Sequence, residues 1–266
     1  MRFLKAFSNS RDVFPTVNIE GGICYYLEEG KYGGSCHYEL LQNKQLFVDK
    51  QRKLDDFEIL IRHPKLSKIV HKVSIIAQKE HSSMVESIMS ADTPFGIPTN
   101  PRDSKKTPFV VNAECKGEFD TPLLYLTGNK RVIEYIRKKD IKKNAQDISY
   151  CKMFIPKARG NSNDSTDLVL GYPEFSPKGM VCSQTFIYAK FNTEEECKNF
   201  IGYLKCKFFR ALVLASKISQ DALASVYRFV PLQDFTRPWT DAELYAKYGL
   251  TEDEIAFIES MIKPME

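Results

Sequence analysis

The most unevenly distributed chemistry in this chain is positive charge. Between Lys130 and Arg159, ten residues are basic and three are acidic, a local net charge of +7. Lysine and arginine contact DNA phosphates and supply the part of the affinity that is independent of base sequence. Charged runs are equally common at solvated helix ends, where cations interact favourably with the helix dipole. The basic residues of this segment are Lys130, Arg131, Arg137, Lys138, Lys139, Lys142, Lys143, Lys152, Lys157 and Arg159.

A second group of candidate side chains lies in a proline-rich stretch. Pro94, Gly96, Pro98 and Pro101 end a helical pattern and open a loop over residues 94–108. Loops of this length are uncommon and are often functional. In the major groove, asparagine suits adenine, whereas arginine and lysine suit guanine O6 and N7. The candidate base-reading residues of this loop are Asn100, Arg102, Lys105 and Lys106.

An alternative chemistry is metal-dependent cleavage of DNA. Asp103, Glu114 and Lys116 follow the order of an acid, then an acid-x-lysine triplet at the end of an expected strand. Two carboxylates can hold magnesium, and the lysine can stabilise the attacked phosphate. Acid-x-lysine triplets also occur by chance in a chain this charged, so the pattern is weakly specific.

Other classes of site have little support. The four histidines are dispersed, and the seven cysteines form no CxxC pair, so neither a zinc site nor a disulfide framework is expected. Free cysteines are typical of a reducing cytoplasm. No apolar run approaches the roughly 18 residues of a membrane span. We therefore expect a soluble cytoplasmic protein, and 266 residues of which 43% are hydrophobic suffice for a substantial core.

The elements of the first half follow from hydrophobic periodicity and turn residues. Glycine-rich residues 28–34 connect two short strands, which we expect to form a terminal hairpin. The expected elements are strands at 18–27 and 35–40, a helix at 65–90, and strands at 109–115 and 122–127.

The basic segment is expected to begin as a helix. Asn129 can cap a helix that carries Val132, Ile133 and Ile136. The cations from Arg137 to Lys143 would then lie at its C-terminal end. A strand follows at 150–155, and a polar loop at 161–167.

The C-terminal part carries three capping boxes. Thr193 with Glu196 begins a helix at about 194–217, which follows a buried strand at 180–191. Thr240 with Glu243 and Thr251 with Glu254 begin two shorter helices. These elements predict an α+β (mixed α/β) fold, because strands and helices alternate without strict order. From Leu232 onward three residues are basic and eight acidic, so this end does not suit a polyanion.

Seven phrases of the sequence stand out by their wording. They are NSRDVFPTVNIEGGICYYLEEGKYGGSC (9–36), PFGIPTN (94–100), YLTGNKRVIEYIRKKDI (125–141), CKMFIPKARG (151–160), SQTFIYAKFNTEEECKNFIGYLKCKFF (183–209), FVPLQDF (229–235) and PWTDAELYAKYGLTEDEIAFIESMI (238–262). In order, and over nearly the whole chain, they resemble the bacterial TaqI-like (gamma-class) adenine-N6 DNA methyltransferases of type II restriction–modification systems. Residues 9–36 resemble the last β-hairpin of the catalytic domain, and the later phrases resemble the target recognition domain that follows it.

The resemblance implies a closing methyltransferase hairpin at 1–40, a target recognition domain with a mixed sheet and helices at 41–235, and a helical tail at 236–266. Its partners would be double-stranded DNA and a methyltransferase catalytic domain on the same or a separate polypeptide. The 266 residues contain neither the glycine-rich S-adenosylmethionine motif nor an Asn-Pro-Pro-Tyr motif for the flipped adenine. No catalytic residue can therefore be carried over, and S-adenosylmethionine is expected to bind only the catalytic part of the parent enzyme.

Three functions remain distinguishable at this point. The leading interpretation is a DNA recognition module of a methyltransferase, in which the basic residues and the loop named above contact DNA. The second is a magnesium nuclease using Asp103, Glu114 and Lys116. The third is a protein scaffold whose acidic tail docks on a partner.

Overall fold

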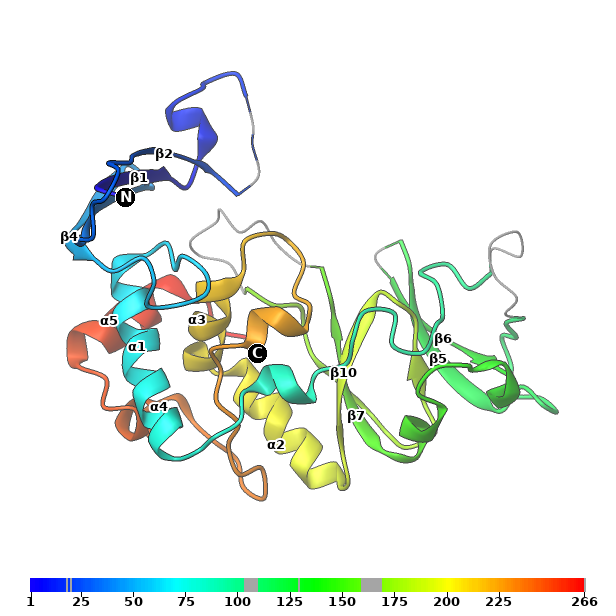
Figure 1. The fold of residues 1–266 in the computed structure, drawn as a ribbon. Helices are drawn as coiled ribbons and strands as arrows, with labels where there is room; N and C mark the ends of the chain where they lie inside the picture. The colour runs from blue at the N-terminus through cyan, green and yellow to red at the C-terminus, as the bar shows by residue number, and fades with distance from the viewer. Residues whose placement is uncertain (18, 20, 103–109, 129, 159–168, 266) are drawn as a thin grey trace.

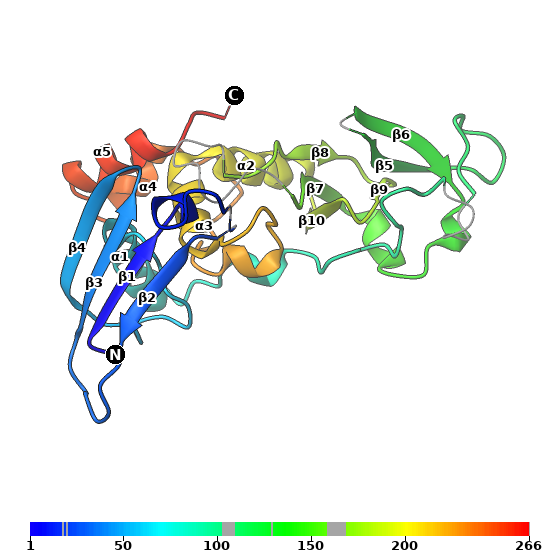
Figure 2. The same cartoon turned by 90° about the horizontal axis from the view of Figure 1, so that it is seen from above.

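The computed structural model describes residues 1–17, 19, 21–102, 110–128, 130–158 and 169–265. These residues form three small β-sheets and five α-helices, which confirms the predicted α+β class (Figure 1). The molecule is elongated: the N-terminal sheet lies at one end and the β5–β6 hairpin at the other (Figure 2). The helices and a central sheet lie between these ends.

The N-terminal sheet has four strands in the order β2-β1-β3-β4. The predicted strands both form, but they are not neighbours. The first strand of the chain lies between them, antiparallel to β2 and parallel to β3, so the predicted hairpin pairing was wrong. The sequence analysis had missed the strand that precedes both. The bounds are β1 (Phe3–Phe7), β2 (Ile23–Leu27), β3 (Cys36–Gln42) and β4 (Gln45–Arg52).

The helical body contains the largest hydrophobic cluster. The predicted helix at 65–90 ends early, because His81 adopts a positive φ of 52° and only a short 3-10 turn follows at Val85–Ile88. All three predicted capping boxes are present, at Thr193, Thr240 and Thr251. The helices are α1 (Pro64–Lys79), α2 (Glu194–Lys205), α3 (Lys207–Ser216), α4 (Asp241–Lys247) and α5 (Glu252–Met261).

The helix predicted at 194–217 is interrupted at Cys206, whose ψ of 142° separates α2 from α3. Cys206 offers no side-chain cap to α3. Instead the carboxylate of Asp241, at the start of α4, accepts the backbone N–H groups of Lys207 and Phe208 at 3.0 and 2.8 Å. The break is therefore stabilised by a residue of the C-terminal tail.

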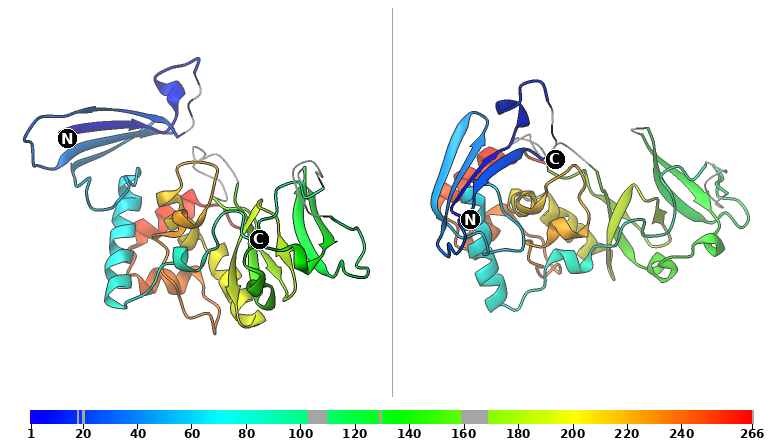
Figure 3. Two further views of the ribbon diagram at one scale, coloured as in Figure 1. Left: turned by 45° about the vertical axis from the view of Figure 1, so that its right-hand side comes forward. Right: turned by 45° about the horizontal axis from the view of Figure 1, so that its top comes forward.

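The central sheet has the order β10-β7-β8 and separates two hydrophobic cores. Because side chains alternate along a strand, Met153 and Ile155 face the helical body, whereas Phe154 faces the second core. The left view of Figure 3 shows this sheet between the helices and the β5–β6 hairpin. The strands are β7 (Cys151–Pro156), β8 (Glu174–Ser176) and β10 (Phe186–Phe191).

The third sheet, β6-β5-β9, carries the largest departure from prediction. Residues expected to form a helix after Asn129 instead form a strand, which pairs with β5 along seven residues. Val132, Ile133, Tyr135 and Ile136 are β-branched or aromatic and fit a strand better than a helix. The strands are β5 (Thr121–Thr127), β6 (Lys130–Ile136) and β9 (Val181–Cys182).

Two further expectations concern segments beside this sheet. Residues 110–115 form no strand, and Asn112 alone bridges to Tyr135. The predicted strand at 180–191 is divided into β9 and β10 by a turn. Of the helices built from the described residues, none has the length and apolarity needed to cross a bilayer.

Candidate nucleic-acid interface

The basic segment after β6 is an exposed irregular stretch rather than a helix end. A short 3-10 turn at Lys138–Asp140 follows the strand, and the chain then passes Lys142 and Lys143 in an open conformation. The side chains of Lys138, Lys139, Lys142 and Lys143 are exposed, as is Lys130 at the start of β6. Compensation of a helix dipole therefore does not account for these cations.

Four of these lysines have no acidic partner in the part of the chain that the structure describes. Among the described residues, no carboxylate lies within salt-bridge distance of Lys130, Lys138, Lys142 or Lys143. Unpaired exposed ammonium groups are available to a polyanion without first breaking an ion pair. We refer to these four residues as the free lysines.

Other cations of the segment are already paired. Arg137 contacts Glu118 at 3.1 Å and Asp140 at 2.7 Å, and Lys139 contacts the same Glu118. Hydrogen bonds from Lys139 and Arg137 hold the pKa of Glu118 below its usual range. The carboxylate of Glu118 thus forms with Arg137 and Lys139 the kind of ion pair that a DNA phosphate would form.

Two more predicted DNA contacts lie in ion pairs nearer the central sheet. Arg131 pairs with Glu174 at 2.9 Å, and Lys157 pairs with Asp92 at 2.8 Å. A hydrogen bond from Lys157 lowers the pKa of Asp92. These cations can reach phosphates only in exchange for their present partners.

Lys152 does not belong to the surface at all. Its side chain is fully buried, and its ammonium donates to the carbonyls of Asp147 and Tyr150 at 3.0 and 2.6 Å. Burial lowers the pKa of Lys152 to about 8. The predicted phosphate contact is not accessible at this position, because the alternation of β7 directs the side chain inward.

The loop that begins at Pro94 is held closely against the basic segment. Phe95 and Ile97 are fully buried in the second core. Asn144 donates to the carbonyl of Pro94 at 2.7 Å, and the side chain of Lys143 lies against Gly96. The start of the candidate reading loop therefore lies beside Lys143 and Asn144 of the basic segment.

Arg102 lies at the end of the described part of this loop. Its Nε donates to Glu134 at 2.9 Å and to the Tyr125 hydroxyl at 3.2 Å, and its Nη2 also donates to Glu134. The Tyr125 hydroxyl donates to Glu134 at 2.6 Å. The hydrogen bond from Arg102 is the main cause that lowers the pKa of Glu134.

Several predicted residues lie outside the described part of the chain, namely Asp103, Lys105, Lys106 and Arg159. Of the proposed nuclease set, Glu114 and Lys116 lie exposed in turns rather than at a strand end. Within the described residues, no three His, Cys, Asp or Glu side chains are grouped to hold a metal. No geometry on the described surface therefore favours the nuclease alternative.

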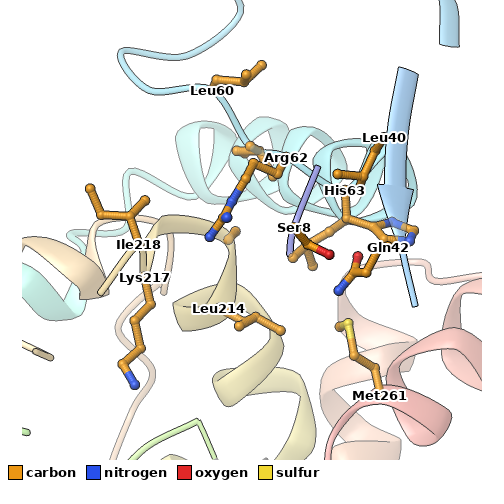
Figure 4. Close-up of a pocket in the computed structure, with 13 residues that line it drawn as sticks. Ser8, Leu40, Gln42, Leu60, Arg62, His63, Leu214, Lys217, Ile218 and Met261 are labelled. Carbon is orange, nitrogen blue, oxygen red and sulfur yellow. The ribbon is translucent and has the colours of Figure 1, made fainter. Parts of the chain in front are cut away.

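A small cavity lies between the end of the N-terminal sheet and helices α1 and α3 (Figure 4). Its volume is about 50 Å³, which fits a few water molecules and is far below the 300–1,000 Å³ typical of ligand pockets. Arg62 at its wall donates to the carbonyl of Gly21 at 2.9 Å. The cavity belongs to the junction between the sheet and the helical body.

The N-terminal sheet presents a second unusual surface. Its register places Tyr25, Leu27, Leu46 and Val48 on one face, and each is about half exposed. Strand β2 is also an edge strand. The apolar residues lie on the two edge strands of this face, and the Lys5–Glu39 ion pair lies between them.

The acidic and tyrosine residues that pair with these cations were not among the candidate residues predicted from the sequence. Glu134 and Tyr125 contact Arg102, and Glu118 contacts Arg137 and Lys139. A strand assignment for residues 130–136 would have placed Glu134 on the same face as Tyr125, two residues diagonally across the β5–β6 pair. Because a helix was predicted for these residues, the proximity of Glu134 to Tyr125 was not predicted.

The comparisons with known proteins give structural similarities but no match in sequence. No protein family matches the sequence, and no curated protein matches it significantly. Among solved structures, the type IIG restriction endonuclease BpuSI is similar at a TM-score of 0.36 and 8% sequence identity. The match covers 98% of this chain and 38% of the BpuSI chain, so this chain spans well under half the length of that enzyme. At this TM-score the similarity carries no argument about fold or function.

Proposed function

We propose that this chain is the DNA recognition module of a restriction–modification adenine methyltransferase. It positions duplex DNA for N6-adenine methylation by a catalytic part outside these 266 residues. The observation that carries the proposal is the set of four exposed free lysines, one of which, Lys143, lies beside the anchored loop from Pro94 to Arg102. Phosphate contacts by lysines fix the register of a protein on DNA, and side chains on a neighbouring element then read the bases.

The assignment to adenine methylation rests on the sequence phrases rather than on geometry. The segment 125–141 resembles the family's recognition domain. It includes the end of β5, the strand β6 and the free lysines Lys130 and Lys138. S-adenosylmethionine and the flipped adenine would be held by the catalytic part, since enzymes that modify a base extrude it into their own pocket. The module would therefore contribute affinity and sequence choice, not chemistry.

The exposed apolar face of the N-terminal sheet supports a catalytic part as the second partner. Tyr25, Leu27, Leu46 and Val48 would be covered by it, as the hairpin resemblance of residues 9–36 also implies. The acidic tail, in contrast, is engaged within this chain, with Glu254 on Lys72 and Glu259 on Lys207. The scaffold alternative therefore loses the feature on which it was based.

The test is the salt dependence of DNA binding. Fluorescence anisotropy with a labelled duplex measures affinity of the full chain over a range of salt concentrations. For Lys130→Ala/Lys138→Ala/Lys142→Ala/Lys143→Ala, we expect the log–log slope to flatten by about 3.6, because each lost phosphate contact removes about 0.9.

A matched control removes the same charge elsewhere. Lys44, Lys50, Lys68 and Lys79 are exposed on the N-terminal sheet and α1, and alanine at all four should leave the slope unchanged. Equal slopes for both quadruple variants would show that net charge, not this surface, binds DNA. Absence of measurable binding by the wild type would contradict the proposed function.

A further inference from the structure

The described part of the candidate reading loop, up to Arg102, is fixed at two points that flank one exposed side chain. At the first point, Gln184 binds the loop twice: its backbone N–H donates to the carbonyl of Ile97, and its side-chain amide donates to the Thr99 hydroxyl, both at 2.8 Å. Phe95 and Ile97 insert into the second core just before it. The loop is thus anchored up to Thr99 although it has no regular secondary structure.

The second point is the site of Arg102. Glu134 and Tyr125 are buried on β6 and β5, and together they offer a carboxylate and a hydroxyl to one guanidinium. Pro101, the preceding residue, is also buried. Arg102 therefore attaches the far end of the described loop to the β5–β6 hairpin.

Between these points lies Asn100, which is exposed. Its side-chain oxygen accepts the backbone N–H of Arg102 at 3.2 Å, which orients the amide relative to the second anchor. An asparagine amide held in one orientation can pair with both N6 and N7 of adenine in the major groove. The two anchors limit how far Asn100 can move.

The contact with Glu134 uses one edge of the Arg102 guanidinium. Nε and Nη2 bind the carboxylate, and the Nη1 groups and the second N–H of Nη2 are the remaining donors. Moving the Nε–Nη2 edge away would leave the buried carboxylate of Glu134 without its cation, which is unfavourable. This edge of Arg102 therefore acts as an anchor for the loop.

We propose that Arg102, Glu134, Tyr125 and Gln184 are positioning residues that hold Asn100 for recognition of a base edge. The proposal rests on the proposed DNA-recognition function and deepens it. It predicts that sequence choice depends on buried residues of the hairpin that never touch DNA.

The first experiment needs no DNA. Hydrogen exchange followed by mass spectrometry on the full chain should show faster exchange in peptides covering 95–102 for Glu134→Gln and Arg102→Lys. Peptides from α2 and β7 should be unchanged. Lys138→Ala is the matched control, since Lys138 is exposed in the same lobe and makes no contact with the loop. Unchanged exchange in the loop for both variants would overturn the anchoring role.

The second experiment measures sequence choice. Wild-type protein selects duplexes from a randomised pool, and affinity is then compared between the enriched duplex and a scrambled one. We expect Arg102→Lys and Glu134→Gln to lower this ratio at least about tenfold, comparable to Asn100→Ala, while binding of the scrambled duplex stays within about twofold. Lysine keeps the charge of Arg102 but cannot fill the two-donor site.

The alternative roles give different results. If Arg102 reads a base, Arg102→Ala changes the selected sequence whereas Glu134→Gln and Tyr125→Phe leave it intact. If Arg102 contacts a phosphate, Arg102→Lys is neutral and Arg102→Ala flattens the salt slope by about 0.9. Either result overturns the proposal. If the wild type binds DNA but enriches no sequence, the positioning role falls while the proposed DNA affinity stands, and if it binds no DNA both fall.

Discussion

The acidic tail and the basic segment are the two most charged parts of this molecule, and they use charge in different ways. In the tail, Asp241 caps α3, Glu254 pairs with Lys72, and Glu259 pairs with Lys207 and accepts the Tyr245 hydroxyl. In the basic segment, Lys138, Lys142 and Lys143 extend into solvent without acidic partners among the described residues. A charge that is paired within the chain contributes to folding, whereas an unpaired charge can bind a partner. The number of charges in a segment does not distinguish these two roles.

Arg210 shows the same distinction among cations. It is fully buried in α3 and donates to the carbonyls of Lys205, Cys206 and Lys263. It therefore joins the end of α2 to the tail, as no exposed lysine does. Burial lowers its pKa, but an arginine stays charged across the accessible pH range.

The largest expected effect comes from removing this buried cation. Arg210→Ala removes the donor from the carbonyls of Lys205 and Lys263, whereas the carbonyl of Cys206 still accepts the backbone N–H of residue 210. Each buried group left unsatisfied costs about 1–3 kcal/mol. We expect the free energy of unfolding to fall by about 3 kcal/mol or more, measured by urea denaturation. Lys138→Ala should change it by less than about 0.5 kcal/mol. Similar losses for both variants would break the comparison between the two regions.

The second prediction concerns pH. His63 caps α1 by accepting the N–H of Lys65 on Nδ1, and it packs between the rings of Phe47 and Phe257. Burial, together with the charge of Lys65, lowers its pKa to about 4. In the unfolded chain, the imidazole of His63 binds a proton near pH 6.5. The contribution of neutral His63 to the free energy of unfolding is therefore complete above pH 6.5. It is lost as the pH falls toward 4, by about 1.4 kcal/mol per pH unit.

His63→Asn isolates this contribution, since asparagine keeps a capping acceptor but does not titrate. Urea denaturation at several pH values should show wild type losing stability relative to the variant between pH 6.5 and 4, and a constant difference above pH 7. A difference that stays constant over the whole range would refute the assignment.

The smallest expected effect comes from removing an acidic partner within the basic segment. Glu118 is the acid that occupies Arg137 and Lys139, so Glu118→Gln should convert paired cations into available ones. We expect non-specific DNA affinity to rise severalfold and the salt slope to steepen by about 0.9–1.8, because one or two more cations reach phosphates. Glu194→Gln, which frees only Lys198 on α2, is the matched control. An equal gain in both variants would attribute the effect to net charge alone.

The sequence determined the features that depend on neighbouring residues. The boxes at Thr193, Thr240 and Thr251 begin helices as predicted, because each needs only a hydroxyl and a glutamate three residues apart. The strand at 150–155 and the α+β class also followed from local periodicity. These are contacts within one turn or along one strand.

The tertiary structure decided what depends on distant residues. Residues 130–136 became a strand because β5 was available to pair with them, although Asn129 and the apolar spacing also fit a helix. Helix 194–217 was divided because Asp241, some thirty residues away, supplies a cap for its second half. Burial inverted the role of Lys152, and Glu134 engages one edge of Arg102. Charge and residue type are written in the sequence, but which charges are already satisfied is fixed only when the chain brings their partners together.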